Sequence, residues 1–79
     1  MPGMSTRGEA ARQVVDGAAI AERRERRGWS QQDLATRAGL AIATISSWEQ
    51  ERVAHPTVDA LGRLAAVLGC RLDDLVRAE

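Results

Sequence analysis

The chain has 79 residues, a single cysteine and equal numbers of acidic and basic residues, so its formal net charge at pH 7 is zero. This length predicts one small domain, and the lone Cys70 excludes an internal disulfide or a multi-cysteine metal site. No apolar run is long enough to span a membrane and the first residues lack the apolar region of a secretory signal, so we expect a cytoplasmic protein.

The N-terminal segment, residues 1–17, leaves two alternatives open. It can be a flexible arm or a short extra helix that ends at Gly17. From residue 18 to residue 79 the apolar residues recur with helical spacing, which predicts one helical domain.

A first helix is predicted from Ala18 to a stop at Gly28. Ile20 and Arg24 are four residues apart and therefore share one face. A charge on an apolar stripe needs a partner, because an unpaired buried ion is strongly unfavourable.

The second helix is predicted to begin after Ser30, which is the expected N-cap. Asp33 stands three residues later, where a capping box usually has Glu or Gln. Gly39 ends the helix in a left-handed turn. The predicted buried stripe consists of Leu34, Ala35 and Ala38.

A third helix starts near Ala41, with Ile45 and Trp48 facing inward. A rotation of about 100° per residue places the opposite side outward, and that side carries Ala43, Ser46, Ser47 and Gln50. Two short helices joined by a glycine-containing turn, here over residues 30–50, are typical of the helix-turn-helix motif.

The C-terminal part predicts two more helices. Pro56 stops the third helix, Thr57 caps a fourth, and Gly69 ends that fourth helix. Its apolar face is expected to contain Val58, Leu61, Leu64, Ala65 and Leu68. A short last helix follows, with apolar positions at Leu72, Leu75 and Val76.

Residues 20–76 resemble the lambda-repressor/Cro-type (XRE-like) helix-turn-helix family. The resemblance rests on the segments IAERRERRGWSQQDLATRAGL, TISSWEQ, PTVDALGRLAAVLG and LDDLV. It implies an all-α fold, a compact five-helix lambda-repressor-like domain. It also implies a DNA-binding transcriptional regulator, normally a repressor that acts as a homodimer on a near-palindromic operator.

The same resemblance assigns roles to individual residues. Gln31 matches a glutamine that approaches a DNA phosphate at a helix N-terminus. Arg52 matches a basic position aimed at the DNA backbone, and Arg37 is a further candidate for phosphate contact. Arg24 and Glu49 match a partly buried ion pair, so we interpret both as structural.

The expected recognition helix departs from the family pattern at its start. Ala41 cannot cap, and neither Ile42 nor Ala43 can hydrogen-bond a base edge, although either can touch a thymine methyl group. The remaining candidates for base contact are the hydroxyl residues Thr44, Ser46 and Ser47. We therefore predict readout with few hydrogen bonds, supported by DNA shape.

Two other functional classes compete with this hypothesis. An exposed Ile42 on a neutral domain favours a protein-interaction module, such as an antitoxin-like protein or adaptor that binds a partner protein. An enzyme is the weakest alternative, because His55 is the only histidine and no acid–base pair, metal cluster or phosphate loop is present in the sequence. We predict no enzyme activity, cofactor or metal, and expect a homodimer formed around Leu72, Leu75 and Val76.

Overall fold

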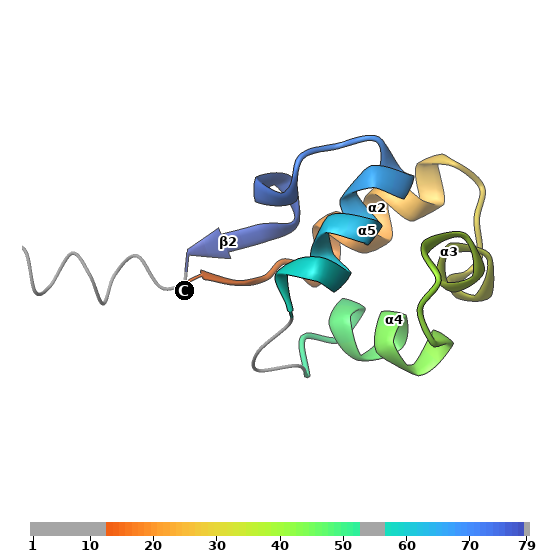
Figure 1. The fold of residues 1–79 in the computed structure, drawn as a ribbon, viewed down its shortest axis with the longest axis horizontal. Coiled ribbons are helices and arrows are strands. Elements are labelled where there is room, and N and C mark those ends of the chain that lie inside the picture. Colours follow the sequence, from red (N-terminus) through yellow and green to blue (C-terminus); the bar gives the residue numbers. More distant parts are fainter. Residues whose placement is uncertain (1–12, 53–56, 79) are drawn as a thin grey trace, which may run out of the picture.

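The computed structural model describes residues 13–52 and 57–78 (Figure 1). In chain order the elements are β1 (Gln13–Val15), α2 (Gly17–Arg26), α3 (Gln31–Ala38), α4 (Ile42–Glu49), α5 (Val58–Leu68), the 3-10 helix η1 (Leu72–Leu75) and β2 (Val76–Ala78). The predicted helical majority is confirmed, because four α-helices lie close to their expected positions.

Side-chain caps fix the start of three of these helices. The Asp16 carboxylate accepts the Ala19 N–H at the start of α2, and the Thr57 hydroxyl accepts the Ala60 N–H at the start of α5. At α3 the predicted capping box is formed, with Ser30 Oγ accepting from the Asp33 N–H and Asp33 accepting from the Ser30 N–H. The fourth helix, α4, begins after Ala41 without a side-chain cap.

A two-stranded antiparallel sheet joins the ends of the described chain, with Val15 opposite Val76. Figure 1 shows β2 at the side of the molecule opposite α3. Within residues 1–17, Gln13–Val15 form strand β1 and Gly17 already begins α2; residues 1–12 lie outside the described residues. The strands correct the strictly all-α prediction. A strand of three residues is too short to show the alternating pattern that identifies strands from sequence.

The predicted fifth α-helix is a single 3-10 turn, Leu72–Leu75. Asp74 closes it by accepting the Arg71 N–H, and Val76 already has the extended backbone of β2. Val76 therefore belongs to the sheet, and the five-helix count is not confirmed.

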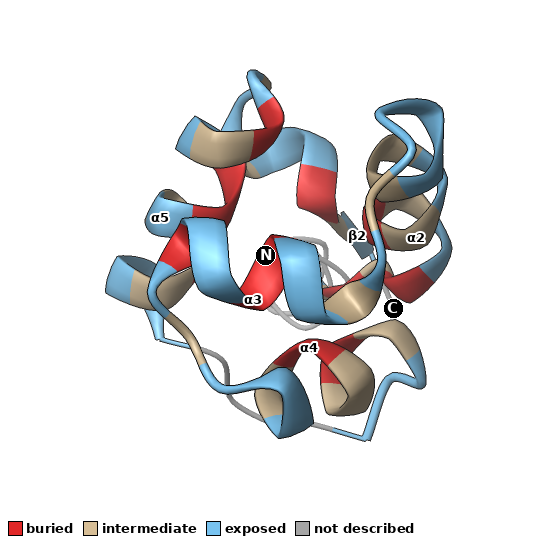
Figure 2. Cartoon of the chain, turned by 90° about the vertical axis from the view of Figure 1, so that its right-hand side faces the viewer, coloured by how far each residue is buried: buried red, intermediate tan, exposed pale blue. Residues whose placement is uncertain are grey.

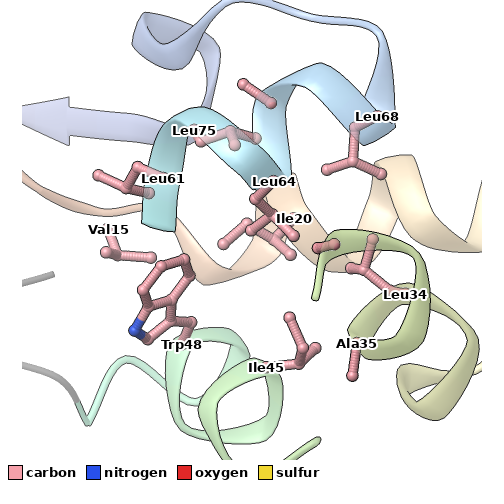
Figure 3. Close-up of a cluster of buried hydrophobic side chains, with 12 residues drawn as sticks. Val15, Ile20, Leu34, Ala35, Ile45, Trp48, Leu61, Leu64, Leu68 and Leu75 are labelled. Atoms are coloured by element: carbon pink, nitrogen blue, oxygen red, sulfur yellow. The ribbon is translucent and has the colours of Figure 1, made fainter. Parts of the chain in front are cut away.

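The core gathers buried side chains from α2, α3, α4, α5, η1 and β1 (Figure 3). In Figure 2 both α3 and α4 carry buried positions; the rest of α3 is mostly exposed, whereas the rest of α4 is mostly intermediate and exposed only at its start. One predicted core position is wrong, because Val58 is 75% exposed. Val58 is the first residue of α5, and the first buried position of that helix is Leu61.

Two predicted features, the helix stop at Pro56 and the loop histidine His55, lie outside the described residues. Among the helices of residues 13–52 and 57–78, none is long and apolar enough to cross a membrane.

Candidate nucleic-acid interface

A helix-turn-helix is formed by α3, a short turn and α4. Gly39 adopts the left-handed conformation, with φ 68°, and Leu40 donates its N–H to the Ala35 carbonyl, so the chain turns sharply after α3. Ile45 and Trp48 are buried and fix the inner side of α4 against the core. Figures 1 and 2 both show α4 at the edge of the molecule, below α3 and α5.

The outer side of α4 is short of hydrogen-bonding groups at its start. Ile42 is 44% exposed and Ala43 is exposed, whereas Thr44, Ser46 and Ser47 are half-buried. The exposed Gln50 donates from its side-chain amide to Ser46 Oγ at 3.0 Å. This surface therefore presents a methyl-rich start followed by small hydroxyl groups and one amide.

Gln31 is half-buried, and its side chain is already engaged within the protein. It is the first residue of α3, and its Nε2 donates to Glu49 Oε1 at 3.0 Å. The predicted phosphate contact of this side chain therefore has to come from the one amide N–H that the bond leaves available, because the amide oxygen, like a phosphate oxygen, only accepts hydrogen bonds.

Arg24 and Glu49 are paired by two side-by-side hydrogen bonds. Arg24 Nε lies 2.7 Å from Glu49 Oε2 and its Nη2 lies 3.1 Å from Oε1, with only 12% and 7% of the two side chains exposed. The hydrogen bond with the Glu49 carboxylate raises the pKa of Arg24 above its ordinary value. Arg24 Nη1 also donates to the Trp29 carbonyl at 2.8 Å, so one guanidinium joins α2, the start of α3 and the end of α4.

The end of α4 departs from the other helix ends. Glu51 has a positive φ of 58° and is the only non-glycine residue of the described segments with that conformation; the equivalent position after the other helices is Gly28, Gly39 or Gly69. The hydrogen bonds of a Schellman motif are present, with Arg52 donating to the Ser47 carbonyl and Glu51 to the Trp48 carbonyl.

Two contacts of the Glu51 carboxylate account for a glutamate at a position that glycine occupies after the other helices. The carboxylate accepts the Gly17 N–H at 3.0 Å, at the start of α2, and it pairs with Arg77 of β2. The Gly17 N–H, and secondly Arg77, hold the pKa of the Glu51 carboxyl below its ordinary value. A Cβ at Gly17 would overlap the Trp48 and Glu49 carbonyl groups, so α2 starts directly against the end of α4.

The two predicted arginine anchors are placed differently. Arg52 is the last residue of the Schellman motif and is exposed. Arg37 is also exposed, but its guanidinium lies 4.4 Å from the centroid of the Trp29 ring. Arg27 lies over the same ring, 5.2 Å from its centroid, and donates to the Leu68 carbonyl. Arg37 is therefore held near the end of α2 by Trp29, and Arg52 is held at the end of α4 by its backbone hydrogen bond.

Three relevant residues escaped the sequence-based selection. Gln50 was placed outward by the helical period but was not selected as a site residue, and its exposed side chain follows directly after the end of α4. Glu51 and Arg77 are 26 residues apart, and no local pattern connects them. Their pairing depends on the sheet that the sequence does not predict.

Comparison with known proteins agrees with this geometry. A family model described as helix-turn-helix matches residues 20–75. No curated protein sequence matches the chain. The crystal structure of SinR, the master regulator for biofilm formation, in complex with DNA is 32% identical, with a TM-score of 0.68 over 72% of this chain and 90% of that chain. The solution structure of the N-terminal DNA-binding domain of SinR from Bacillus subtilis is 32% identical, with a TM-score of 0.69 over 76% of this chain and 87% of that one.

A third similar structure belongs to a different kind of molecule. The Fe(II) form of HppE is 28% identical, with a TM-score of 0.72 over 86% of this chain. The likeness covers only 35% of the HppE chain. It therefore supports the fold and gives no reason to transfer the iron site of HppE.

Proposed function

Since the chain belongs to the helix-turn-helix family, we propose that it is a sequence-specific DNA-binding transcription regulator, a repressor that acts as a homodimer on a near-palindromic operator. One observation carries this proposal. The recognition helix α4 is fixed by two buried side chains on its inner side and lies at the edge of the molecule, where its first two residues are exposed and its hydroxyl residues are half-buried. A helix in that position can enter the major groove of DNA. SinR, which has the same arrangement at 32% identity, is known in complex with DNA.

Binding in this mode uses two kinds of contact. Gln31 and Arg52, both near the end of α4, contact phosphates, which sets the register of the protein without reading sequence. Arg37 is a more distant phosphate contact that would have to leave Trp29. Base contacts come from the outer side of α4, where Ile42 and Ala43 touch thymine methyl groups. The hydroxyl groups of Thr44, Ser46 and Ser47 add weak hydrogen bonds to base edges.

Because the chain carries no net charge, the residues proposed to contact phosphate, Gln31 and Arg52, become important. Non-specific affinity for DNA comes mainly from basic residues that displace counterions. With a formal net charge of zero, the chain has to obtain its affinity from local placement of charge. Dimerisation adds a second set of anchors, at half-sites about 34–36 Å apart.

The dimer contact needs revision in one respect. Leu75 is fully buried within its own chain, so it cannot lie in the contact that was expected around Leu72, Leu75 and Val76. Leu72 and Val76 are half-buried and pack against the same core. The proposed homodimer therefore does not draw on surplus apolar surface at Leu75.

Selection of binding sites from random-sequence DNA tests the function directly. We expect an enriched site with two-fold symmetry and an affinity that falls as salt concentration rises. Recovery of no preferred sequence, together with the absence of salt-dependent binding, would count against DNA binding. A selected site without symmetry would instead remove the dimer from the proposal.

A second candidate function is binding of a partner protein. The observation in its favour is Ile42, a large apolar side chain that is 44% exposed at the start of α4. SinR is also known in a complex with SinI, although this chain matches only 54% of the SinR chain in that structure. Co-purification of a stoichiometric protein partner from native cells, with no DNA selected, would favour this alternative.

A further inference from the structure

Glu49 is shared by two donors from two different helices. Its Oε1 accepts from Gln31 Nε2 at 3.0 Å and from Arg24 Nη2 at 3.1 Å, while its Oε2 accepts from Arg24 Nε at 2.7 Å. Glu49 is the last residue of α4 and Gln31 is the first residue of α3, so the bond crosses the helix-turn-helix. The side chain of Glu49 is only 7% exposed, which shields these bonds from water.

The chemistry of this contact decides which way the Gln31 amide points. An ionised carboxylate only accepts hydrogen bonds, so it binds the amide nitrogen and repels the amide oxygen. With the nitrogen turned toward Glu49, the second N–H on the same nitrogen remains available. A DNA phosphate is also purely an acceptor, and it can bind the Gln31 side chain only through that N–H. The orientation imposed by Glu49 therefore makes an N–H donor available to phosphate.

Arg24 allows the Glu49 carboxylate to lie close to the surface that is proposed to bind DNA. Its guanidinium forms two parallel hydrogen bonds with Glu49 and offsets a charge that would otherwise repel phosphate. It also holds the Trp29 carbonyl, one residue before the N-cap of α3. The helix start and the Gln31 side chain are thus placed by the same ion pair.

From these contacts we propose that Glu49, held by Arg24, is a positioning residue that sets the Gln31 amide in the orientation able to donate to a DNA phosphate. This inference rests on the proposed DNA-binding function and extends it. It assigns to the Arg24–Glu49 pair an effect on DNA affinity that is separate from its effect on stability.

The test compares Gln31→Ala, Glu49→Gln and the double variant, with Gln32→Ala as the matched control. Gln32 is the exposed neighbour whose amide bonds to Thr36 on its own helix. For protein shown to be folded, Gln31→Ala and Glu49→Gln are each expected to weaken DNA binding by about 2- to 10-fold. The double variant should be no weaker than the weaker single variant, and Gln32→Ala should bind like the wild type.

A second readout does not depend on DNA or on the stability of Glu49→Gln. In the wild-type NMR spectrum, the Gln31 side-chain amide protons should differ widely in chemical shift, and the proton bonded to Glu49 should exchange slowly. The Gln32 amide protons, whose bond to Thr36 is exposed to water, should exchange faster than the Gln31 proton bonded to Glu49. Averaged, fast-exchanging Gln31 protons would overturn the proposed orientation.

The outcomes separate this inference from the proposed function. If the wild type binds DNA and folded Glu49→Gln binds equally well, the positioning role is wrong while the function stands. Multiplicative losses in the double variant would also contradict it, since they would show two independent effects. If the wild type binds no DNA, both the function and the positioning role fail.

Discussion

The two ends of the recognition helix α4 are held in opposite ways. At its end, Glu49 and Glu51 accept hydrogen bonds from α2, α3 and β2, so three other elements fix its position. At its start, Ala41 provides no side-chain cap and the next residues, Ile42 and Ala43, are exposed. From this difference we propose that the end of α4 supports the fold and the phosphate-contacting residues, while its start makes the base contacts.

Glu49→Ala should cause the largest loss of stability, because it removes the carboxylate that accepts hydrogen bonds from Arg24 and Gln31 at the end of α4. Loss of one partner from a buried ion pair costs about 3–5 kcal/mol of folding free energy, since the other charge is left unpaired. Urea or guanidinium midpoints measure the change. Glu22→Ala is the matched control, because it breaks the exposed pair with Arg26 and should cost about 0–1 kcal/mol. Equal midpoints for the two variants would show that the end of α4 is not held by this pair.

Gly17→Ala should have the next largest effect, at the place where α2 meets the end of α4. The added Cβ would overlap the Trp48 and Glu49 carbonyl groups, and overpacking of this kind costs about 1–3 kcal/mol. Gly62→Ala in α5 meets no atom within 4 Å and should instead stabilise the fold by about 0.4–1 kcal/mol. Opposite signs in thermal unfolding are expected; a stabilising Gly17→Ala would contradict the close contact.

Ala41→Ser should strengthen the weakly held start of α4. A serine there can accept the free N–H groups of the first turn, and an N-cap of this kind contributes about 0.5–2 kcal/mol. The midpoint of thermal unfolding should rise, by roughly 4–8 °C for each kcal/mol gained in a domain of this size. Ser30→Ala, which removes the existing cap of α3, should lower it by a similar amount. An unchanged midpoint for Ala41→Ser would indicate that the start of α4 is already satisfied.

Glu51→Gln should give the smallest effect, visible mainly as a change in pH dependence. The pKa of Glu51 is lowered in the folded protein by the Gly17 N–H and by Arg77. A lowered pKa contributes stability above the unfolded-state pKa, and this contribution is lost as the pH falls through the folded-state value. The wild type should therefore exceed Glu51→Gln in stability at neutral pH, and the difference should vanish in acid. A difference that is constant from neutral pH to strongly acidic pH would contradict the charged contact.

Much of the fold was predictable because its signals are local. The capping box of Ser30 and Asp33 and the left-handed Gly39 follow from residues that are at most a few positions apart. The inward positions of Ile45 and Trp48 follow from the helical period alone. Interactions between residues close in the sequence can therefore be predicted from the sequence alone.

The features that were missed depend on contacts between distant segments. The strand Gln13–Val15 exists because Val76–Ala78 lies beside it, and Val76 therefore extends instead of continuing a last helix. Glu51 takes a conformation usually left to glycine, where its carboxylate reaches both Gly17 and Arg77. The link from Gln31 to Glu49 was missed for the same reason, although both residues had been singled out.

The division of labour along α4 is tested most directly by measuring the ratio of affinities for the selected operator and for scrambled DNA. Arg52→Ala should weaken both complexes by the same factor, leave the ratio unchanged, and reduce the slope of log affinity against log salt by about 1. Ile42→Ala should leave the affinity for scrambled DNA unchanged and lower the ratio, as should replacement of the contacted thymines by uracil. The reverse result, with discrimination lost in Arg52→Ala and preserved in Ile42→Ala, would contradict the assignment of reading to the start of the helix and anchoring to its end.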